Sequence, residues 1–374
     1  MEKLGLGLNP SSQIHYTDHL AVICILMGIP LLFIDELDYS LGQKYYPGLN
    51  AIKQEYEGFN PEYLIANYDV LFMSDLWDRD TFHEKFGGLE KKYHKVLRHV
   101  HVPHGYSDKS FYLKKAANED IVLVYGQNML DMFKEAEVFE NLHHYVITGN
   151  YRLTFFKQNR AFYDQIIEKE VLGHFAKKQP VILYAPTWLD LEESTTFFDT
   201  YHELLEKLPS DYNMIVKLHP RLELDDTAKY YHIVGKYESK PNILFLKDFP
   251  LVYPLLAHSD MYLGDMSSVG YDFLPFNKPM FFLNKHKKDA KYDRNAYLFR
   301  CGIPILPDRY SQIYQIIEQN LTNDVERFGS IRREVDHYTF GIERSFDDIK
   351  ADIVQAYSDD YYASIACHKN AKSV

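Results

Sequence analysis

Two serines that follow an apolar run carry the clearest chemical signal in this chain. Residues 261–263 are typical of a buried strand, and Gly264 and Asp265 follow them as a turn. Ser267 and Ser268 then stand where the next helix should begin. The first N–H groups of a helix have no partner within it and its dipole favours negative charge, so this turn is a candidate phosphate site. The alternative is an ordinary capped helix, because serine is favoured at helix starts for structural reasons alone.

A second polar group follows the expected strand at residues 214–218. Lys217 lies within this run, and His219 and Arg221 come directly after it. Arginine can bind two phosphate oxygens at once, and histidine and lysine can donate to them. These three residues are therefore candidate donor-phosphate contacts, with His219 also a candidate catalytic residue. The alternative is a surface turn opened by Pro220.

The expected strand at residues 181–184 is followed by Thr187 and Trp188. The threonine hydroxyl could bond to a phosphate, and the tryptophan ring could stack on a base. Packing in the interior or between domains is the more frequent fate of a tryptophan, so this signal is weak by itself.

A histidine beside a glycine follows the expected strand at residues 100–102. His104 precedes Gly105, and Lys109 lies further along the same loop. The ordinary pKa of histidine lies near neutrality, so His104 is a candidate general base, and Lys109 could screen an anion. The chain has 17 histidines, so position alone does not decide this role.

The first long helix, expected at residues 15–27, opens with two histidines. His15 and His19 are four residues apart and share a helix face, a spacing that can hold a metal, but no third ligand is evident. We expect no metal and no cofactor. A helix start capped by Thr17 or Asp18 is the structural alternative, and acceptor binding by His15, Asp18 and His19 is the functional one.

A cluster of lysines with Arg294 lies at residues 285–294, in a chain whose formal net charge is −12. This cluster could contact anionic lipid or a polyanionic acceptor, although a solvated loop is the more frequent outcome. The acidic balance argues against a general nucleic-acid binder.

Short apolar runs alternate with amphipathic stretches, a pattern typical of parallel sheets covered by helices. Strands are expected at residues 30–34, 70–73, 100–102, 121–124 and 145–147, and then at 181–184, 214–218, 243–246, 261–263 and 280–283. Helices are expected at 15–27, 128–133, 197–208 and 251–257. Ligands of such sheets bind beyond the carboxyl ends of the strands, where the candidate residues stand.

The length of 374 residues indicates two α/β domains facing across a cleft. We expect a Rossmann-like acceptor domain at residues 1–165 and a Rossmann-like nucleotide-donor domain at 166–344. A helix in residues 345–374 is expected to pack back on the first domain.

Three widely spaced cysteines, Cys24, Cys301 and Cys367, indicate a reducing compartment. The N-terminus lacks the apolar segment of a signal peptide, and the apolar run at residues 20–34 is too short to span a bilayer. We expect a cytoplasmic protein, with contact to the inner face of the membrane left open. Neither a G-x-G-x-x-G, a P-loop nor a G-x-S-x-G motif is present, which disfavours the enzyme classes that use them.

Taken together, the strand ends resemble the CDP-glycerol glycerophosphotransferase family, the polymerases and primases of wall teichoic acid synthesis. Five motifs occur in the family's order over roughly residues 100–285: HG with Lys109 (family pattern WHGTPLK), TGNYR at 148–152 (TGxPR), ILYAPTW at 182–188, KLHP at 217–220 and GDMSSVGYDF at 264–273.

The resemblance implies a GT-B fold and a transferase that needs no metal. It implies that His104 is the general base, that His219 contacts the donor pyrophosphate, and that Ser267 and Ser268 hold donor phosphates. Asp265 and Asp272 would shape the phosphate-binding turn. The donor would be CDP-linked and the acceptor a hydroxyl, lipid-linked or polymeric.

The chain departs from the family pattern at several places. Pro103 and Tyr106 replace the Trp and Thr of WHGTPLK, Tyr151 replaces the Pro of TGxPR, and Leu189 replaces the Arg that usually follows APTW. Two alternatives therefore stay open. One is a nucleotide-sugar glycosyltransferase or UDP-GlcNAc 2-epimerase-like enzyme, and the other is a non-catalytic nucleotide- or glycan-binding module.

Overall fold

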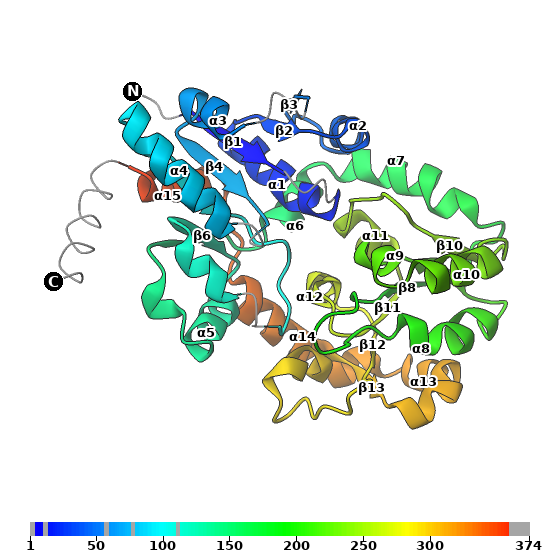
Figure 1. Ribbon diagram of the computed structural model, residues 1–374. Helices are drawn as coiled ribbons and strands as arrows, with labels where there is room; N and C mark the ends of the chain where they lie inside the picture. The colour runs from blue at the N-terminus through cyan, green and yellow to red at the C-terminus, as the bar shows by residue number, and fades with distance from the viewer. Residues whose placement is uncertain (1–3, 10–13, 56–59, 76–78, 110–112, 359–374) are drawn as a thin grey trace. The chain divides into compact units, whose positions relative to one another are not determined.

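The computed structural model describes residues 4–9, 14–55, 60–75, 79–109 and 113–358 (Figure 1). The chain forms two compact units. The first comprises Met1–His104, Ser110–Phe155 and Thr339–Val374, and the second comprises Gly105–Lys109 and Phe156–Tyr338. The division expected at 165/166 falls inside a helix of the second unit, α7 (Arg160–Glu170). The short segment Gly105–Lys109 joins the second unit although the residues on both sides of it belong to the first.

The first unit contains a seven-stranded parallel sheet with the order β3-β2-β1-β4-β5-β6-β7. Its strands are β1 (Gly5–Leu8), β2 (Leu31–Phe33), β3 (Ala51–Lys53), β4 (Val70–Met73), β5 (Arg98–His101), β6 (Ile121–Val124) and β7 (Tyr145–Ile147). Its helices are α1 (Ile14–Met27), α2 (Glu36–Tyr45), α3 (Pro61–Asn67), α4 (Arg79–Tyr93), η2 (Leu113–Asn118), α5 (Gln127–Glu135), η3 (Phe139–Asn141) and α15 (Phe346–Ala356). Helix α6 (Tyr151–Gln158) begins in this unit and ends in the second.

The second unit contains a six-stranded parallel sheet with the order β10-β9-β8-β11-β12-β13. Its strands are β8 (Val181–Ala185), β9 (Asn213–Val216), β10 (Ile243–Phe245), β11 (Met261–Gly264), β12 (Met280–Leu283) and β13 (Ile303–Ile305). Its helices after α7 are η4 (Leu172–His174), α8 (Phe197–Tyr201), η5 (His202–Glu206), α9 (Arg221–Asp225), α10 (Thr227–Tyr237), α11 (Tyr253–His258), α12 (Ser268–Phe273), η6 (Leu274–Phe276), η7 (Arg294–Cys301), η8 (Pro307–Gln312), α13 (Ile313–Asn320) and α14 (Asp324–Phe340), the last ending beyond the unit. The expectation of two parallel α/β sheets is confirmed.

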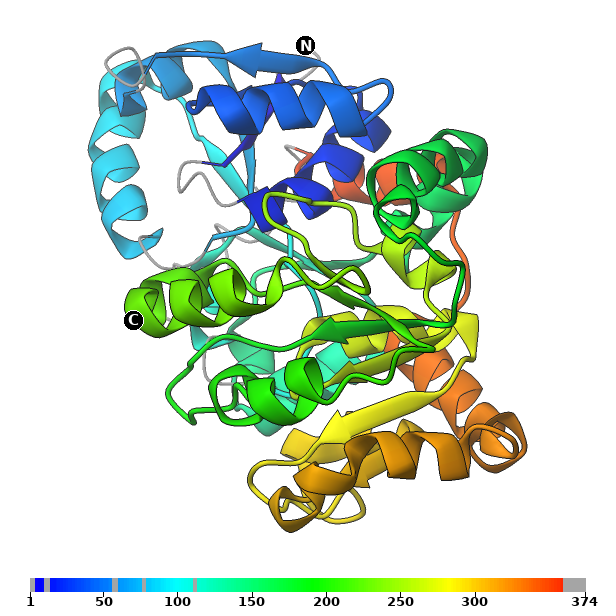
Figure 2. The ribbon, with the colours of Figure 1, turned by 90° about the vertical axis from the view of Figure 1, so that its right-hand side faces the viewer.

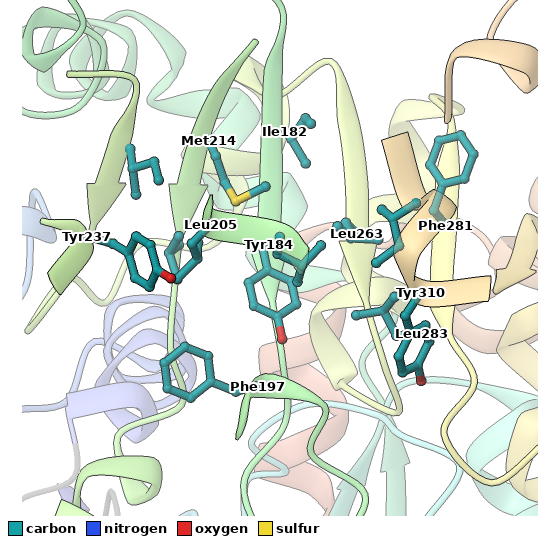
Figure 3. Close-up of a cluster of buried hydrophobic side chains, with 14 of the residues drawn as sticks. Ile182, Tyr184, Phe197, Leu205, Met214, Tyr237, Leu263, Phe281, Leu283 and Tyr310 are labelled. Atoms are coloured by element: carbon teal, nitrogen blue, oxygen red, sulfur yellow. The ribbon is translucent and has the colours of Figure 1, made fainter. Parts of the chain in front are cut away.

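The side chains of alternate strand residues build the core of the second unit (Figure 3). Tyr184, Leu263 and Phe281 point to one face of the sheet, where Phe197 of α8 and Tyr237 of α10 pack against the same cluster. Figure 2 shows helices on both faces of this sheet. Both faces are therefore covered, which explains why the strands read as continuous apolar runs.

Strand β1 is a central strand that the sequence analysis did not predict. Its glycines disfavour a strand by propensity but permit close packing. A Cβ on Gly7 would lie 2.2 Å from Cys24 Sγ of α1, so only glycine lets this helix lie on the strand. The other unpredicted strands, β3 and β13, lie at sheet edges, and β13 contains Pro304, which an edge strand tolerates.

Helix α15 contacts α1 and β7 of the first unit, and it is drawn in red in Figure 1. Ser345 caps it by accepting from the Asp348 N–H at 3.1 Å.

Residues 359–374, including Cys367, lie outside the described part of the chain. Within the described ranges, no helix combines the length and apolarity needed to cross a bilayer.

Candidate functional site

The turn between β11 and α12 holds the two serines that opened the sequence argument. Ser267 occupies the N-cap position with an extended backbone, but its side chain makes no capping hydrogen bond. An ordinary serine cap therefore does not explain this residue. Ser268 begins the helix and is half-buried.

Asp265 is buried and uses its carboxylate to organise the neighbouring loop. It accepts hydrogen bonds from Thr187 N at 2.7 Å, Thr196 N at 2.9 Å and Thr196 Oγ1 at 2.9 Å. Burial raises its pKa to about 6, against the lowering effect of these donors. Both carboxylate oxygens are therefore engaged by protein donors, and one of them holds the Thr187 backbone beside the serine turn. Asp272 is also buried and accepts from the Tyr253 hydroxyl at 2.9 Å.

Lys109 reaches the same place from the segment Gly105–Lys109. Its ammonium donates to Thr187 Oγ1 at 2.8 Å and pairs with Asp190 at 2.5 Å, and both charged side chains are buried. Burial raises the pKa of Asp190, but the Lys109 ammonium outweighs that effect and leaves the pKa below its ordinary value. Sequence reasoning had no signal for Asp190. The structure thus joins Lys109, Thr187 and the Asp265 turn in one buried polar cluster.

The residues after β8 and β9 form a separate group, because these two strands are neighbours in the sheet. The Arg221 guanidinium lies 4.3 Å from the centre of the Trp188 ring, and the His219 ring lies 6.3 Å from it. His219 Nδ1 accepts from the Arg221 N–H at 3.2 Å, so its proton resides on Nε2. The Lys217 ammonium donates to the Phe249 carbonyl at 2.7 Å.

Gly105 brings the backbone of the Lys109 segment against Ser268. Its φ of +112° lies in the region that favours glycine, and a Cβ there would stand 2.7 Å from Ser268 Oγ. Both the backbone conformation and the available space therefore require glycine.

His104 belongs to the first unit and is half-buried. Its Nδ1 lies 3.2 Å from the Ser74 carbonyl oxygen. A carbonyl only accepts, so Nδ1 carries the proton and Nε2 has the lone pair that a general base needs. Burial lowers the pKa of His104, while the Ser74 carbonyl and Asp75 oppose that shift. The ring is therefore neutral at pH 7.

Helix α1 brings its first turn to His104. The His15 and His104 rings are 6.2 Å apart, and the Tyr16 ring is 4.8 Å from that of His104. His19 is buried deeper, where its Nδ1 lies 3.1 Å from the Tyr125 hydroxyl, and burial holds its pKa well below the ordinary value. Of the proposed acceptor residues, His15 thus lies beside the candidate base, whereas His19 is part of the packing.

Asp18 forms a buried ion pair with Arg152, the last residue of the TGNYR motif. The Nη1–Oδ2 distance is 2.8 Å, and Asp18 also accepts from the Tyr46 hydroxyl at 2.9 Å. The expectation of an acceptor contact or a helix cap did not foresee this partner, which lies 134 residues away in the chain.

Replacing Arg152 with alanine should destabilise the protein by about 3–5 kcal/mol, because it leaves the Asp18 carboxylate buried without its counter-ion. Arg160→Ala is the matched control: Arg160 pairs with Asp164 at 2.6 Å, but Arg160 is exposed and Asp164 is only half-buried, and such a surface pair contributes about 0.5 kcal/mol. Urea unfolding of both variants measures the difference. Equal small losses of stability in the two variants would show that the Asp18–Arg152 pair does not stabilise the position of helix α1.

The basic residues at 285–294 are largely paired within the second unit. Lys285 pairs with Asp199 at 2.8 Å, Lys288 with Glu192 at 3.0 Å and Arg294 with Asp108 at 3.3 Å. These ion pairs reduce the attraction of the cluster for anionic lipid.

Among the described residues, no three His, Cys, Asp or Glu side chains gather as a metal site.

Comparison with known proteins connects this arrangement to one family. The family described as CDP-Glycerol:Poly(glycerophosphate) glycerophosphotransferase matches residues 91–303, more than half of the chain. The teichoic acid glycerol-phosphate primase of Bacillus subtilis strain 168 is 25% identical over 305 residues, which cover 74% of this chain and 73% of that protein. The teichoic acid poly(glycerol phosphate) polymerase of the same organism is 26% identical over 255 residues, covering 64% of this chain and 32% of the polymerase.

Solved structures share the fold. The wall teichoic acid polymerase TagF matches with a TM-score of 0.58 at 15% identity, covering 98% of this chain and 90% of that one. The S. aureus MnaA–UDP structure matches with a TM-score of 0.58 at 12% identity, covering 97% and 98%. Anabaena Alr3699/HepE in complex with UDP-glucose matches with a TM-score of 0.55 at 13% identity, covering 95% and 99%.

Proposed function

Because the chain belongs to the CDP-glycerol:poly(glycerophosphate) glycerophosphotransferase family, it is a transferase of polyol phosphate from a CDP-linked donor in wall polymer synthesis, and we propose that it transfers glycerol phosphate. The acceptor we propose is a hydroxyl of a surface polymer or of its lipid-linked precursor. The observation that carries the donor assignment is the cluster in which Asp265 and Lys109 both bond to Thr187 beside the Ser267–Ser268 turn.

The proposed reaction is a displacement at phosphorus. His104 Nε2 takes the proton of the acceptor hydroxyl as the acceptor oxygen attacks the phosphorus that bears the glycerol. A new P–O bond forms, the bond from that phosphorus to the bridging diphosphate oxygen breaks, and CMP leaves with the electron pair. The neutral ring and the Nδ1 contact with Ser74 support this role, because they leave Nε2 as the accepting nitrogen.

The donor contacts we propose divide by chemistry. Backbone N–H groups and hydroxyls of Ser267 and Ser268 would bind the diphosphate together with cationic or N–H donors from the other strand ends. Those donors are His219, Lys217, Arg221 and Lys109. Thr187 would add a hydroxyl and Trp188 a stacking face for the base. Loss of one such preorganised donor typically costs about 10²–10³ in rate.

Asp265 and Asp272 have a different proposed role. Both carboxylates are buried and bonded to protein donors, which supports positioning of the phosphate-binding turn. The acceptor role of His15 is supported by its place beside His104. We also propose contact with the inner face of the membrane. The ion pairs of the cluster at 285–294 reduce the positive charge that this cluster offers to anionic lipid.

A nucleotide-sugar reaction is the second candidate, because structures with the same fold hold UDP or UDP-glucose. The fold alone does not choose the base or the atom that is attacked.

A ligand screen separates these candidates. The free protein is heated with CDP-glycerol, CDP-ribitol, CMP-sialic acid, UDP-GlcNAc or free nucleotides, and hits are measured by calorimetry. A ligand that binds the folded protein raises its melting temperature by mass action. We expect stabilisation by CDP-glycerol that is lost in Ser268→Ala and kept in Ser210→Ala, a serine on an exposed turn. A hit confined to UDP-sugars would overturn the proposal in favour of the second candidate.

A further inference from the structure

A buried polar network fastens the segment Gly105–Lys109 to the rest of the second unit. Its centre is Asp108, of which only 5% is exposed. The carboxylate accepts from the Tyr271 hydroxyl at 2.5 Å, from Leu298 N at 3.1 Å and from Arg294 Nη1 at 3.3 Å. Three donors from two different elements, α12 and η7, thus converge on one side chain of the segment.

Arg294 closes the network by bonding to a second residue of the same segment. Its Nη2 donates to the Tyr106 hydroxyl at 2.9 Å, and the Tyr106 ring packs edge-on against Tyr271 with the ring centres 4.7 Å apart. The planar guanidinium is suited to this bridge, because its N–H groups point in fixed directions toward two acceptors. Burial raises the pKa of Asp108 to about 6, which shows how strongly this carboxylate is enclosed.

Two residues of this network, Tyr106 and Asp108, lie in the motif where the chain departs from its family pattern. WHGTPLK has Thr, Pro and Leu where this chain has Tyr106, Ser107 and Asp108. Burying a carboxylate and a guanidinium costs desolvation energy that an apolar pair would avoid, so such a pair is weak evidence for stability. Its directional bonds do fix geometry. The segment they fix bears Gly105 against Ser268 and Lys109 against Thr187.

We propose that Arg294 is a positioning residue for the transfer reaction, acting through Tyr106 and Asp108 on the segment Gly105–Lys109. It keeps the Gly105 backbone against Ser268 and the Lys109 ammonium on Thr187. This inference rests on the proposed function, which assigns Ser268, Lys109 and His104 to the reaction.

The test compares Arg294→Gln with Arg300→Gln. Arg300 is the matched control, since both guanidiniums lie over the Tyr297 ring, at 4.9 Å and 4.5 Å, but Arg300 has no bond to the segment. We expect Arg294→Gln to lower kcat by roughly tenfold or more, because small misplacements of reacting groups have effects of this size. The KM for CDP-glycerol should change much less. Arg300→Gln should keep the wild-type kcat. Equal losses in both variants, or no loss in either, would overturn the proposal.

A second variant covers the case in which Arg294→Gln does not fold. Tyr106→Phe removes the hydroxyl that accepts from Arg294 and keeps the ring packing, so it should lower kcat by itself, and by less than Arg294→Gln. Where both variants fold, the two losses should not add in the double variant, because each change breaks the Arg294–Tyr106 bond. Fully additive losses would contradict the proposed route.

Hydrogen exchange separates this inference from the proposed function. Backbone amides of residues 105–109 should exchange faster in Arg294→Gln than in Arg300→Gln, whatever the substrate of the enzyme. Unchanged exchange in Arg294→Gln would overturn the positioning role. Faster exchange in a protein that transfers nothing from CDP-glycerol would overturn only the proposed donor.

Discussion

Replacing His104 with alanine should lower turnover by about 10²–10⁴-fold, the usual contribution of a general base, while donor binding stays nearly unchanged. The expectation follows from the ring's surroundings. The Ser74 carbonyl fixes the proton on Nδ1, and the lone pair of Nε2 is then the group that accepts the acceptor's proton. Steady-state release of CMP and calorimetric titration with CDP-glycerol measure the two quantities separately.

The pH dependence of the wild type gives an independent check of the same residue. Only neutral His104 can accept a proton, and burial lowers its pKa from the ordinary 6.5. Activity should therefore persist at pH 6.5 and fall only at lower pH, as the ring becomes protonated. A rate that falls as the pH drops from 8 to 7 would contradict this assignment.

The control for His104→Ala is His144→Ala, which removes a half-buried histidine whose ring stacks on Tyr145 at 6.4 Å. This variant should retain wild-type turnover. If His104→Ala lost donor affinity and turnover to the same degree, His104 would be a donor-binding residue rather than the base.

Substituting Gly105 with alanine should cost about 1–3 kcal/mol of stability through backbone strain and lower turnover by roughly 10²-fold. At φ +112° an L-residue is strained, and its Cβ would stand 2.7 Å from Ser268 Oγ. The serine side chain is short, so the backbone of the segment or of the phosphate-binding turn has to move. Unfolding in urea and CMP release measure the two effects.

Gly48→Ala separates the strain from the clash. Gly48 has φ +86°, but a Cβ there meets nothing within 4 Å. This control should lose a similar part of its stability to strain and keep its turnover. Equal turnover in the Gly105 and Gly48 variants would show that the approach of Gly105 to Ser268 does not matter for the reaction.

The strand ends were readable from the sequence because buried parallel strands appear as uninterrupted apolar runs. The ten expected strands are all present, and the polar residues after 181–184 and 261–263 do lie together, through Asp265 and Thr187. The family assignment from the five motifs is confirmed as well. Local patterns carried this information because each motif lies within a few residues of one strand end.

The features that the sequence analysis did not predict depend on contacts between residues far apart in the chain. β1 was not predicted because Gly5 and Gly7 lower strand propensity, while Gly7 is required by helix α1, whose Cys24 Sγ would lie 2.2 Å from a Cβ at that position. The bond between Asp108 and Arg294 joins residues 186 positions apart, and no local pattern pairs them. The helix predicted at 197–208 divides into α8 and the wider π-turns of η5, a change that apolar periodicity does not register.

The most direct test of the central claim is an analysis of products. The protein is incubated with CDP-glycerol, labelled in the glycerol phosphate, and with a panel of hydroxyl acceptors that includes glycerol-phosphate oligomers. The account predicts CMP and an acceptor lengthened by one labelled phosphodiester-linked unit, in equal amounts and dependent on His104. Release of a nucleoside diphosphate with transfer of a sugar from a UDP-linked donor, and no reaction with CDP-glycerol, would contradict it.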